Sequence, residues 1–440
     1  MYASVTNLLQ LVAGNKNVRR DVLKMKKHFL ALGLAAALLA PQAAGAEGFA
    51  IYEWSAEGLA MGGARMFAED DAANLAYNPA SITKVQGEAF KTSATYISPH
   101  GKYDATTAGG VVSGKNRIHP AWAPGMYYVR QINDKEWVGM GTWSRFGMVS
   151  QFERNSVAGS NAFSSKMNGV SLGVNYARKL DSKWTASVGA EVNYVGLQLD
   201  KNVLAPTANA SPLHIEGETY ALGWNAAANY EFDKKNEIGV VYRSKINHSM
   251  EADYDAHGKL VAGPVGYYGP AGDAYACVSL PESLTLGYNH KFDDKNRVEL
   301  NYIWTRWERY NALDITFTPN NGNPSFTVPQ AKNWSNGKRF AIGYEHKFSD
   351  KYSGMLGYAY DHSSIPYEGG DFMIPTGTRT TYSIGGQYHD KKQTLAVSVG
   401  WMDVGSLDFK GDLSHGDTFS SAHTRDSYTK MASISYQRKF

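Results

Sequence analysis

Six short phrases rich in Asp, Lys and Asn recur along the chain from Ile132 onward, and they constrain the fold more than any other feature. Each phrase separates two runs in which apolar residues alternate with small or polar ones, as in Val170–Tyr176. Turn residues between two such runs predict a β-hairpin. A period of two gives each strand one apolar and one polar face. The phrases begin at Ile132, Leu180, Phe232, Phe292, Phe348 and His389.

The pattern predicts a closed barrel in a membrane in preference to a soluble sandwich. The runs are about 10 residues or longer, which is enough to cross a bilayer at a tilt. Long Gly/Pro/Asn-rich stretches alternate with the tight turns, and the 28 Tyr and 10 Trp suit the aromatic girdles of such barrels. We expect the long loops at Leu204–Gly217, Ala256–Ala276 and Pro319–Gln330.

The number of strands follows from the turns. The six turns join twelve strands, Ala89–Ser98 adds one before them as the partner of Ala123–Gln131, and Tyr428–Phe440 adds one at the end. The predicted fold class is therefore all-β, a transmembrane antiparallel β-barrel of about 14 strands formed by residues 86–440. Pairing of the last strand with the first would leave no unpaired edge in lipid.

Residues 47–85 differ in kind from the rest, because they are rich in Ala and Gly and show no alternation. Their clearest helical piece is Asp70–Tyr77, opened by two Asp residues and ended before Pro79. A barrel of this size would be open to water unless something filled it. We expect these residues to form an N-terminal plug, or hatch, inside the lumen.

Residues 1–46 read as an upstream extension followed by a cleaved secretory signal. Lys26 and Lys27 precede the apolar run Phe29–Ala40, and Ala44-Gly45-Ala46 forms a cleavage site before Glu47. The alternative of a membrane anchor is disfavoured because the run is far short of the roughly 20 residues that a span needs. Met25 is a plausible true start in place of Met1.

The basic character of the chain belongs to this leader. Residues 1–46 hold six basic side chains and one acidic one, so their removal turns the net charge of +3 into −2. A nucleic-acid partner therefore loses its main support. Cys277 is the only cysteine, so no internal disulfide can form.

Several motifs carry a resemblance to a known family. They include the following residues: Gly48-Phe49, Ser55–Gly58, Asp70-Asp71-Ala72, Asn78-Pro79-Ala80, Ala121–Met126, Ile132–Lys135, Leu280–Leu284 and Thr305-Arg306-Trp307. With them, Glu47–Phe440 resembles the outer-membrane long-chain fatty acid transporter (FadL) family, which also includes aromatic hydrocarbon transporters. The resemblance implies a bacterial outer-membrane location, a monomer, and passive uptake of hydrophobic molecules, most of all long-chain fatty acids.

The resemblance also implies a route. A hydrophobic molecule is caught among the extracellular loops, passes to an apolar pocket lined partly by the mature N-terminus, and leaves sideways into the outer-membrane lipid where the third strand kinks. It assigns three groups of residues: the plug motif Asn78, Pro79 and Ala80; the ligand pocket Phe49, Tyr52 and Arg145; and the lateral-gate kink Ser144, Phe146 and Gly147. Each has a plainer alternative, such as a helix terminator, a packing aromatic or an ordinary strand glycine.

The sequence supports other functions less well. Gly169–Gly173 matches G-x-S-x-G, but it lies within an alternating run and lacks the strand–turn–helix context of a nucleophile, so we expect no enzyme. The sequence shows no metal motif and indicates no cofactor. A structural or adhesive surface barrel and a hydrophilic porin remain as alternatives. The cations available for a fatty acid head group are Arg145, Lys245, Arg306 and Arg309.

Overall fold

The structure is a computed structural model that describes residues 48–204, 210–256, 262–263, 266–267 and 269–440. These residues belong to one compact unit, Pro41–Phe440. The expected leader, residues 1–46, lies outside the described residues, as does Glu47. Among the residues that are described, no helix is long and apolar enough to span a membrane.

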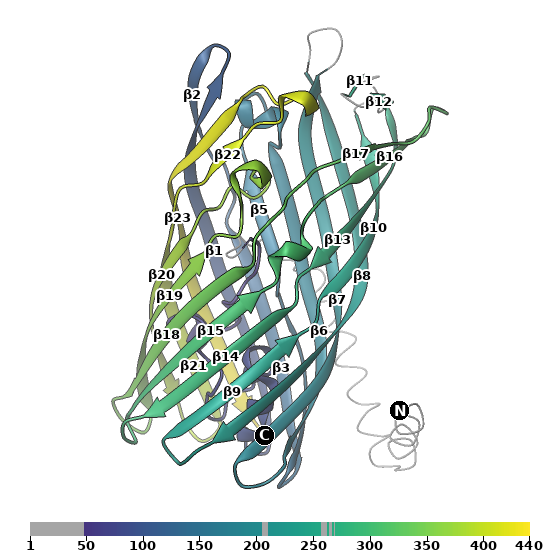
Figure 1. Cartoon of the computed structure of the whole chain (residues 1–440). Coiled ribbons are helices and arrows are strands. Elements are labelled where there is room, and N and C mark those ends of the chain that lie inside the picture. Colours follow the sequence, from purple (N-terminus) through teal and green to yellow (C-terminus); the bar gives the residue numbers. More distant parts are fainter. Residues whose placement is uncertain (1–47, 205–209, 257–261, 264–265, 268) are drawn as a thin grey trace. The chain divides into compact units, whose positions relative to one another are not determined.

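The described strands form a closed antiparallel ring, drawn in Figure 1. Its fourteen wall strands, in order round the ring, are β1 (Glu88–Thr107), β3 (Ala121–Asn133), β4 with β5 (Glu136–Trp143 and Gly147–Gln151), β6 (Ser164–Lys179), β7 (Trp184–Leu204), β8 (Ala210–Glu231), β9 with β10 (Asn236–Arg243 and Ile246–Asp255), β13 with β14 (Ala271–Leu280 and Ser283–Lys291), β15 with β16 (Asn296–Thr305 and Ile315–Pro319), β18 (Gly337–Lys347), β19 (Tyr352–His362), β20 (Arg379–His389), β21 with β22 (Gln393–Val404 and Asp408–Lys410) and β23 (Ser421–Lys439). The predicted all-β barrel of about fourteen strands is confirmed.

Closure is made by the first and last strands. β1 pairs with β23 from Ala89 opposite Lys439 to Thr106 opposite Ser421. β1 also pairs with β3, with Ala89 opposite Val129. This ladder contains the pairing predicted between the first strand and Ala123–Gln131. Every wall strand thus pairs with a neighbour on both sides over at least part of its length, as lipid requires of an exposed backbone.

All six predicted turns join neighbouring wall strands at one end of the barrel. They share one piece of local chemistry, in which a side-chain oxygen accepts a hydrogen bond from the backbone N–H two residues later. Asp181 accepts from Lys183 at 2.7 Å, and Asp233 accepts from Lys235 at 2.7 Å. The same contact is made by Asn133, Asp293, Ser349 and Asp390. Local sequence therefore sets these turns.

The opposite end carries the longer connections. They contain β2 (Gly110–Lys115), β11 (Ala262–Gly263), β12 (Gly266–Tyr267), β17 (Phe326–Val328), η2 (Val157–Ser160), η3 (Trp307–Arg309), η4 (Tyr367–Gly369) and η5 (Leu413–His415). The predicted loop Leu204–Gly217 is wrong in its second half, because β8 begins at Ala210. Likewise β13 begins at Ala271 within the predicted loop Ala256–Ala276. These strands continue their ladders well beyond the length that a bilayer crossing needs.

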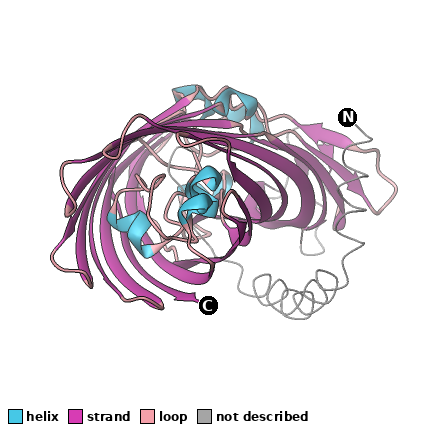
Figure 2. Ribbon diagram, turned by 90° about the horizontal axis from the view of Figure 1, so that it is seen from below, coloured by secondary structure: helices cyan, strands magenta, loops and turns pink. Residues whose placement is uncertain are grey.

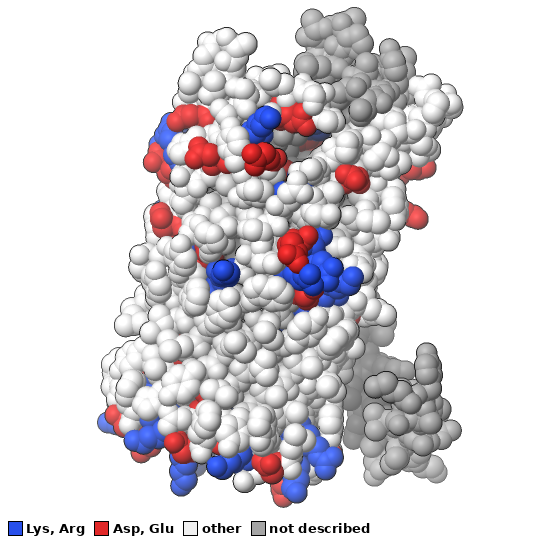
Figure 3. Space-filling model, in the orientation of Figure 1, with Lys and Arg blue, Asp and Glu red and all other residues white. Residues whose placement is uncertain are grey.

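The outer face of the wall is apolar over a broad band. Figure 3 shows charged side chains gathered at both ends of the visible face, with a largely uncharged band between them that is interrupted near mid-height by a cluster of both signs and by a smaller basic group beside it. The exposed apolar side chains of the wall include Trp122, Tyr220, Leu222, Trp224, Phe340, Ile342, Tyr382, Ile384, Val397, Val399 and Ile434. Such a band suits lipid contact, and the polar partners of the alternation face inward.

Residues Gly48–Val85, called the lumen segment from here on, lie inside the ring, as Figure 2 shows. The segment contains α3 (Ala56–Ala60), α4 (Asn74–Tyr77) and η1 (Pro79–Lys84). Its backbone bonds to inward side chains of separate wall strands, with Ala56 N–H donating to Ser435 of β23 at 2.7 Å and Arg339 of β18 donating to the Gly62 carbonyl at 2.7 Å. Almost all of its residues are buried.

The predicted helix Asp70–Tyr77 forms only over its second half, Asn74–Tyr77. Asp70 instead adopts a left-handed turn conformation, with φ of 55°. The Asp71 carboxylate accepts from the Ala73 N–H at 2.9 Å, which satisfies a local donor without a longer helix. Tertiary contacts of these two Asp residues outweigh their value as helix starters.

Close approach between segment and wall depends on strand glycines, and the closest contact is at Gly357. A Cβ on Gly357 of β19 would lie 2.1 Å from the Gly62 nitrogen and 2.3 Å from the Met61 carbonyl carbon, both backbone atoms that cannot turn aside. A Cβ on Gly386 of β20 would meet only the Ser353 carbonyl, at 3.5 Å. The two glycines therefore form a matched pair for testing how the segment docks.

We expect Gly357→Ala to weaken the docking of the lumen segment, because overpacking costs about 1–3 kcal/mol. The purified variant should melt at lower temperature in detergent and should lose the lumen segment to protease faster than the parent. Gly386→Ala should behave like the parent in both measurements. Equal behaviour of the two variants would contradict this account of the contact.

Candidate functional site

The third wall strand is broken at Ser144–Phe146, between β4 and β5. The β3–β4 ladder ends with Met126 opposite Thr142. Beyond it, β5 still pairs with β6, from Gly147 opposite Asn168. No ladder joins β5 to β3 in the described part of the chain. We call this unpaired stretch, between Ala121–Gly125 of β3 and Gly147–Gln151 of β5, the wall break.

The limits of the wall break are defined by hydrogen bonds. At its far end the Arg117 N–H donates to the Gln151 carbonyl at 2.6 Å. Pro124 lies in the unpaired part of β3, and a proline suits a strand edge because it has no N–H to donate to a ladder. The sequence of β3 is therefore compatible with a missing neighbour.

The start of the lumen segment pairs with the broken strand from inside. Ala50 and Phe146 form an isolated antiparallel bridge. The Ile51 N–H donates to the Arg145 carbonyl and the Gly147 N–H donates to the Phe49 carbonyl, each at 2.9 Å. Backbone groups that β3 leaves unpaired thus find partners in the segment. We call this contact the bridge.

Phe49 anchors the bridge in an aromatic cage. Its ring lies 4.7 Å from Trp307, 5.6 Å from Tyr310, 6.0 Å from Phe146 and 6.1 Å from Trp334, measured between centroids. Edge-on contacts of this kind add about 0.5–1.5 kcal/mol each beyond burial. Phe49, a predicted pocket residue, thus lies directly beside the broken strand.

A narrow cavity lies on each side of the bridge. The outer cavity, of about 90 Å³, is bordered by Gly48, Met148, Val149, Phe152 and Phe372, among others. The inner cavity, of about 40 Å³, is bordered by Ala50, Tyr52, Arg145, Phe146 and Arg243, among others. Along both paired chains the outer set lies beyond the bridge, at Gly48 and Met148, whereas the inner set begins with the bridge residues Ala50 and Phe146 themselves. The bridge therefore lies between the two cavities.

The outer cavity is the more apolar of the two, and Phe372 is central to it. Its ring lies 4.8 Å from Tyr103, 5.1 Å from Phe152, 5.0 Å from Phe409 and 5.4 Å from Phe419. Neither cavity is wide enough for a long acyl chain. A ligand of that kind would need part of its lining to move.

Arg145, a predicted pocket residue, already has a partner. Its guanidinium donates to the Glu191 carboxylate at 2.5 Å, and both side chains are buried. Tyr52, also predicted for the pocket, borders the inner cavity and packs against the Arg339 guanidinium at 4.6 Å. Of the other cations considered, Arg306 and Arg309 pair with Glu282 on a partly exposed surface.

The predicted plug motif lies away from the bridge. Asn78 caps η1 by accepting from the Ala80 N–H at 3.1 Å, and Pro79 is the first residue of η1. The Asn78 amide also donates to Asn229 of β8 at 2.7 Å. Contact with the third strand comes instead from neighbours of the motif, since a Cβ on Gly139 would lie 2.7 Å from a Leu75 methyl group.

Trp54 is a site residue that sequence reasoning missed. Its indole N–H donates to the Ser144 carbonyl at 2.6 Å, so it ties the kink to the lumen segment. The backbone N–H of Trp54 donates to the Tyr77 hydroxyl at 3.0 Å. Gly58 makes room for that hydroxyl, because a Cβ there would lie 1.7 Å from it. The only feature of the sequence that points to Trp54 as a site residue is the presence of a tryptophan so close to the start of the segment.

Buried ion pairs hold to the wall the part of the segment that lies nearer the tight turns, from Glu57 to Asp71. We call this part the turn-side half. Lys91 of β1 donates to Glu57 at 2.9 Å and to Asp71 at 2.7 Å. Arg65 pairs with Asp71 at 3.3 Å and with Glu345 of β18 at 3.2 Å. Burial raises the pKa of Asp71, but Lys91 and then Arg65 outweigh it and hold that pKa below its usual value.

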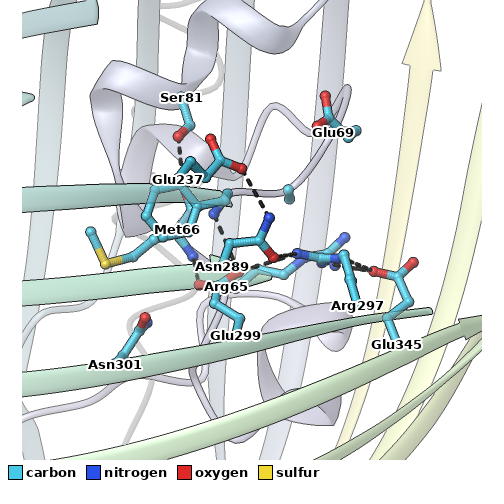
Figure 4. Close-up of polar contacts among 12 residues, drawn as sticks. Arg65, Met66, Glu69, Ser81, Glu237, Asn289, Arg297, Glu299, Asn301 and Glu345 are labelled. Atoms are coloured by element: carbon cyan, nitrogen blue, oxygen red, sulfur yellow. Dashed lines mark hydrogen bonds and ion pairs between the residues drawn. The ribbon is translucent and has the colours of Figure 1, made fainter. Parts of the chain in front are cut away.

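The network continues along the wall, as Figure 4 shows. Arg297 pairs with Glu345 at 2.7 Å and with Glu299 at 3.2 Å, and Glu299 accepts from the backbone N–H groups of Met66 and Phe67. No group of acidic, His or Cys side chains suited to a metal ion occurs among the described residues. The charges therefore pair with one another around the segment.

A closed ring with an apolar outer band, a filled lumen and an interrupted strand defines the structural class as an outer-membrane barrel. Residues 36–424 match the family described as "Outer membrane protein transport protein (OMPP1/FadL/TodX)". The chain belongs to this family, so it is an outer-membrane transport protein and not an enzyme.

Curated relatives match over most of their length. The chain is 26% identical to the long-chain fatty acid transport protein of Escherichia coli K12 over 413 residues, covering 84% of this chain and 91% of the relative. It is 27% identical to outer membrane protein P1 of Haemophilus influenzae, covering 93% of this chain and 97% of the relative.

Solved structures share the fold. A Pseudomonas aeruginosa FadL homologue matches with a TM-score of 0.78 at 18% identity, covering 89% of this chain and all of the homologue (100%). The Pseudomonas putida toluene transporter TodX matches with a TM-score of 0.68 at 16% identity, covering 88% of this chain and 99% of TodX. These likenesses support the barrel architecture.

We expect Lys91→Met to destabilise the protein by about 3–5 kcal/mol, because it leaves Glu57 and Asp71 as buried charges without their shared cation. Lys102→Met, on the same strand, should cost less than about 1 kcal/mol, because its pair with Asp426 is solvent-exposed. Denaturant unfolding of both purified variants measures the difference. Similar losses from the two substitutions would show that the buried network contributes little.

Proposed function

We propose that this protein takes up hydrophobic molecules, above all long-chain fatty acids, across the outer membrane by passive diffusion. The observation that carries the proposal is the bridge, where the lumen segment seals a broken wall strand between two cavities. A transporter needs a barrier at such a point that can give way. An ordinary porin needs a continuous aqueous lumen, which the lumen segment fills.

The route begins at the outer cavity, whose apolar side chains suit an acyl chain. Each CH₂ that leaves water there contributes roughly 0.8 kcal/mol. Movement of Gly48–Ile51 away from Phe146 would join the two cavities and expose the wall break. The substrate would then leave sideways between β3 and β5 into the bilayer, with Ser144, Phe146 and Gly147 forming the gate.

The turn-side half of the lumen argues for a lateral exit. A substrate moving straight through would have to pass the buried charges of Arg65, Asp71 and Lys91. Apolar chains gain nothing from such surroundings, whereas the wall break opens toward lipid. In this scheme the lumen segment is the plug, and Asn78-Pro79-Ala80 is its docking motif on β8.

We propose fatty acids as the substrate in preference to aromatic hydrocarbons, because the curated relatives named for their substrate are long-chain fatty acid transport proteins. The toluene transporters are related to this chain by fold at low identity. The closed ring needs no second subunit to satisfy its edges, so we propose a monomer.

A reversible disulfide across the bridge tests the proposal. Ala50 and Phe146 are a non-hydrogen-bonded antiparallel pair, the arrangement that brings two Cβ atoms closest. In a Cys277→Ser background, Ala50→Cys with Phe146→Cys should block uptake of radiolabelled oleate by a host that lacks its own transporter. Dithiothreitol should restore uptake, because it frees the bridge.

Controls are the Cys277→Ser parent and the two single-cysteine variants, all checked for membrane insertion by heat-modifiable gel mobility. If the inserted parent imports no oleate, the fatty acid proposal is wrong, and toluene uptake by the same cells tests the alternative. Uptake that continues with the disulfide fully formed would show that the bridge is not the gate.

A further inference from the structure

We propose that Arg243 recognises the negatively charged head group of the substrate, in the inner cavity below the bridge. This inference rests on the proposed function and names the chemistry of its substrate, an amphiphile that carries one carboxylate. It places the head-group cation at a residue that none of the sequence motifs singled out.

Arg243 has buried hydrogen-bonding capacity that the protein does not use. It is the last residue of β9, faces the lumen and is only 4% exposed. One terminal nitrogen, Nη2, donates to the Ala76 carbonyl, whereas Nη1 has no hydrogen-bond partner. Among the described residues, no carboxylate lies within ion-pairing distance of it. Leaving a buried guanidinium without a counter-charge is destabilising unless something else compensates.

The cavity around Arg243 is built for a small polar group. Ser283 and Thr285 also border it, and their hydroxyl groups can donate hydrogen bonds to an anion. Its volume of about 40 Å³ is roughly three times what one water needs. That space fits a carboxylate but not the chain attached to it.

The electrostatic balance of this cavity favours one anion. Two guanidinium groups border it, and Arg145 is neutralised by Glu191. The excess charge is therefore that of Arg243. The Trp54 ring lies 5.7 Å from the Arg243 guanidinium and shields one side of it from other partners. Low surrounding polarity strengthens a charge-assisted hydrogen bond to a carboxylate.

The position of Arg243 explains how the tail and the head group would be placed. The bridge separates the inner cavity from the apolar outer cavity. Once the bridge opens, an acyl chain can occupy the outer cavity while its carboxylate reaches Arg243. A neutral hydrocarbon cannot offset the buried charge, so the same residue selects against it.

Paired probes of equal chain length test this assignment. Equilibrium binding of radiolabelled oleate and of oleyl alcohol is measured on the purified protein in nanodiscs at neutral pH, and uptake of both is measured in cells. Parent protein should bind oleate more tightly than the alcohol. Arg243→Gln should weaken oleate binding about tenfold or more and leave the alcohol within about twofold. Arg243→Lys, which keeps the charge, should retain an intermediate affinity for oleate.

Arg178→Gln is the control, since it removes an exposed arginine, paired with Glu136, that lies outside both cavities. The assignment is overturned if Arg243→Gln weakens both probes equally, if it changes neither, or if the parent binds both alike. The last comparison needs no variant, so it holds even if Arg243→Gln fails to fold. Oleate uptake that is unchanged in Arg243→Gln refutes this inference alone, whereas absence of uptake by the parent refutes the transport proposal.

Discussion

Backbone hydrogen bonding in lipid is the constraint on which the rest of this structure depends. A strand in a bilayer has no water to replace a missing neighbour, so the ring closes through β1 and β23. The third strand is the exception, because β5 leaves β3. Its backbone groups at Arg145 and Gly147 are instead satisfied by the lumen segment. The weakest place in the wall is thus also the place where the segment is most needed.

The same constraint directs charge inward. Buried charges on the wall strands face the lumen, where they meet charges on the segment, as with Lys91 and Glu57. Pairing lowers the cost of burying each group, and removal of either partner would be costly. In an empty barrel the polar inner faces of the strands would line an open pore. In this structure they are the surface on which the segment docks.

Most of the wall could be predicted because its signals are local. The turn at Asp181 or Asp233 is encoded within a few residues, and the alternation beside it sets the faces of both strands. The extent of strands beyond the bilayer could not be predicted, because β7 and β8 continue through residues with weak strand patterns. The helix at Asp70 was wrong for a related reason, since its neighbour Asp71 pairs with Lys91, 20 positions later.

The site was predictable only where it coincides with a motif or a strand irregularity. Phe49 and Phe146 could be named, but their contact could not be derived from spacing. Arg145 and Arg243 are equivalent as sequence, each a cation near the end of a strand run. They differ in their partners. Arg145 donates to Glu191, 46 positions later in the sequence, whereas Nη1 of Arg243 has no hydrogen-bond partner. Such differences arise only when the ring is closed.

The proposed opening of this barrier would cost least at its N-terminal end. The bridge consists of two backbone hydrogen bonds and the aromatic contacts of Phe49. Beyond Trp54 the segment is held by ion pairs that are buried on both sides, so their rupture would leave charges without partners. On the proposed route, Gly48–Ile51 would therefore be released more easily than the turn-side half. In the proposed mechanism the fold thereby combines a fixed part with a short movable end, and that end lies against the interrupted third strand of the wall.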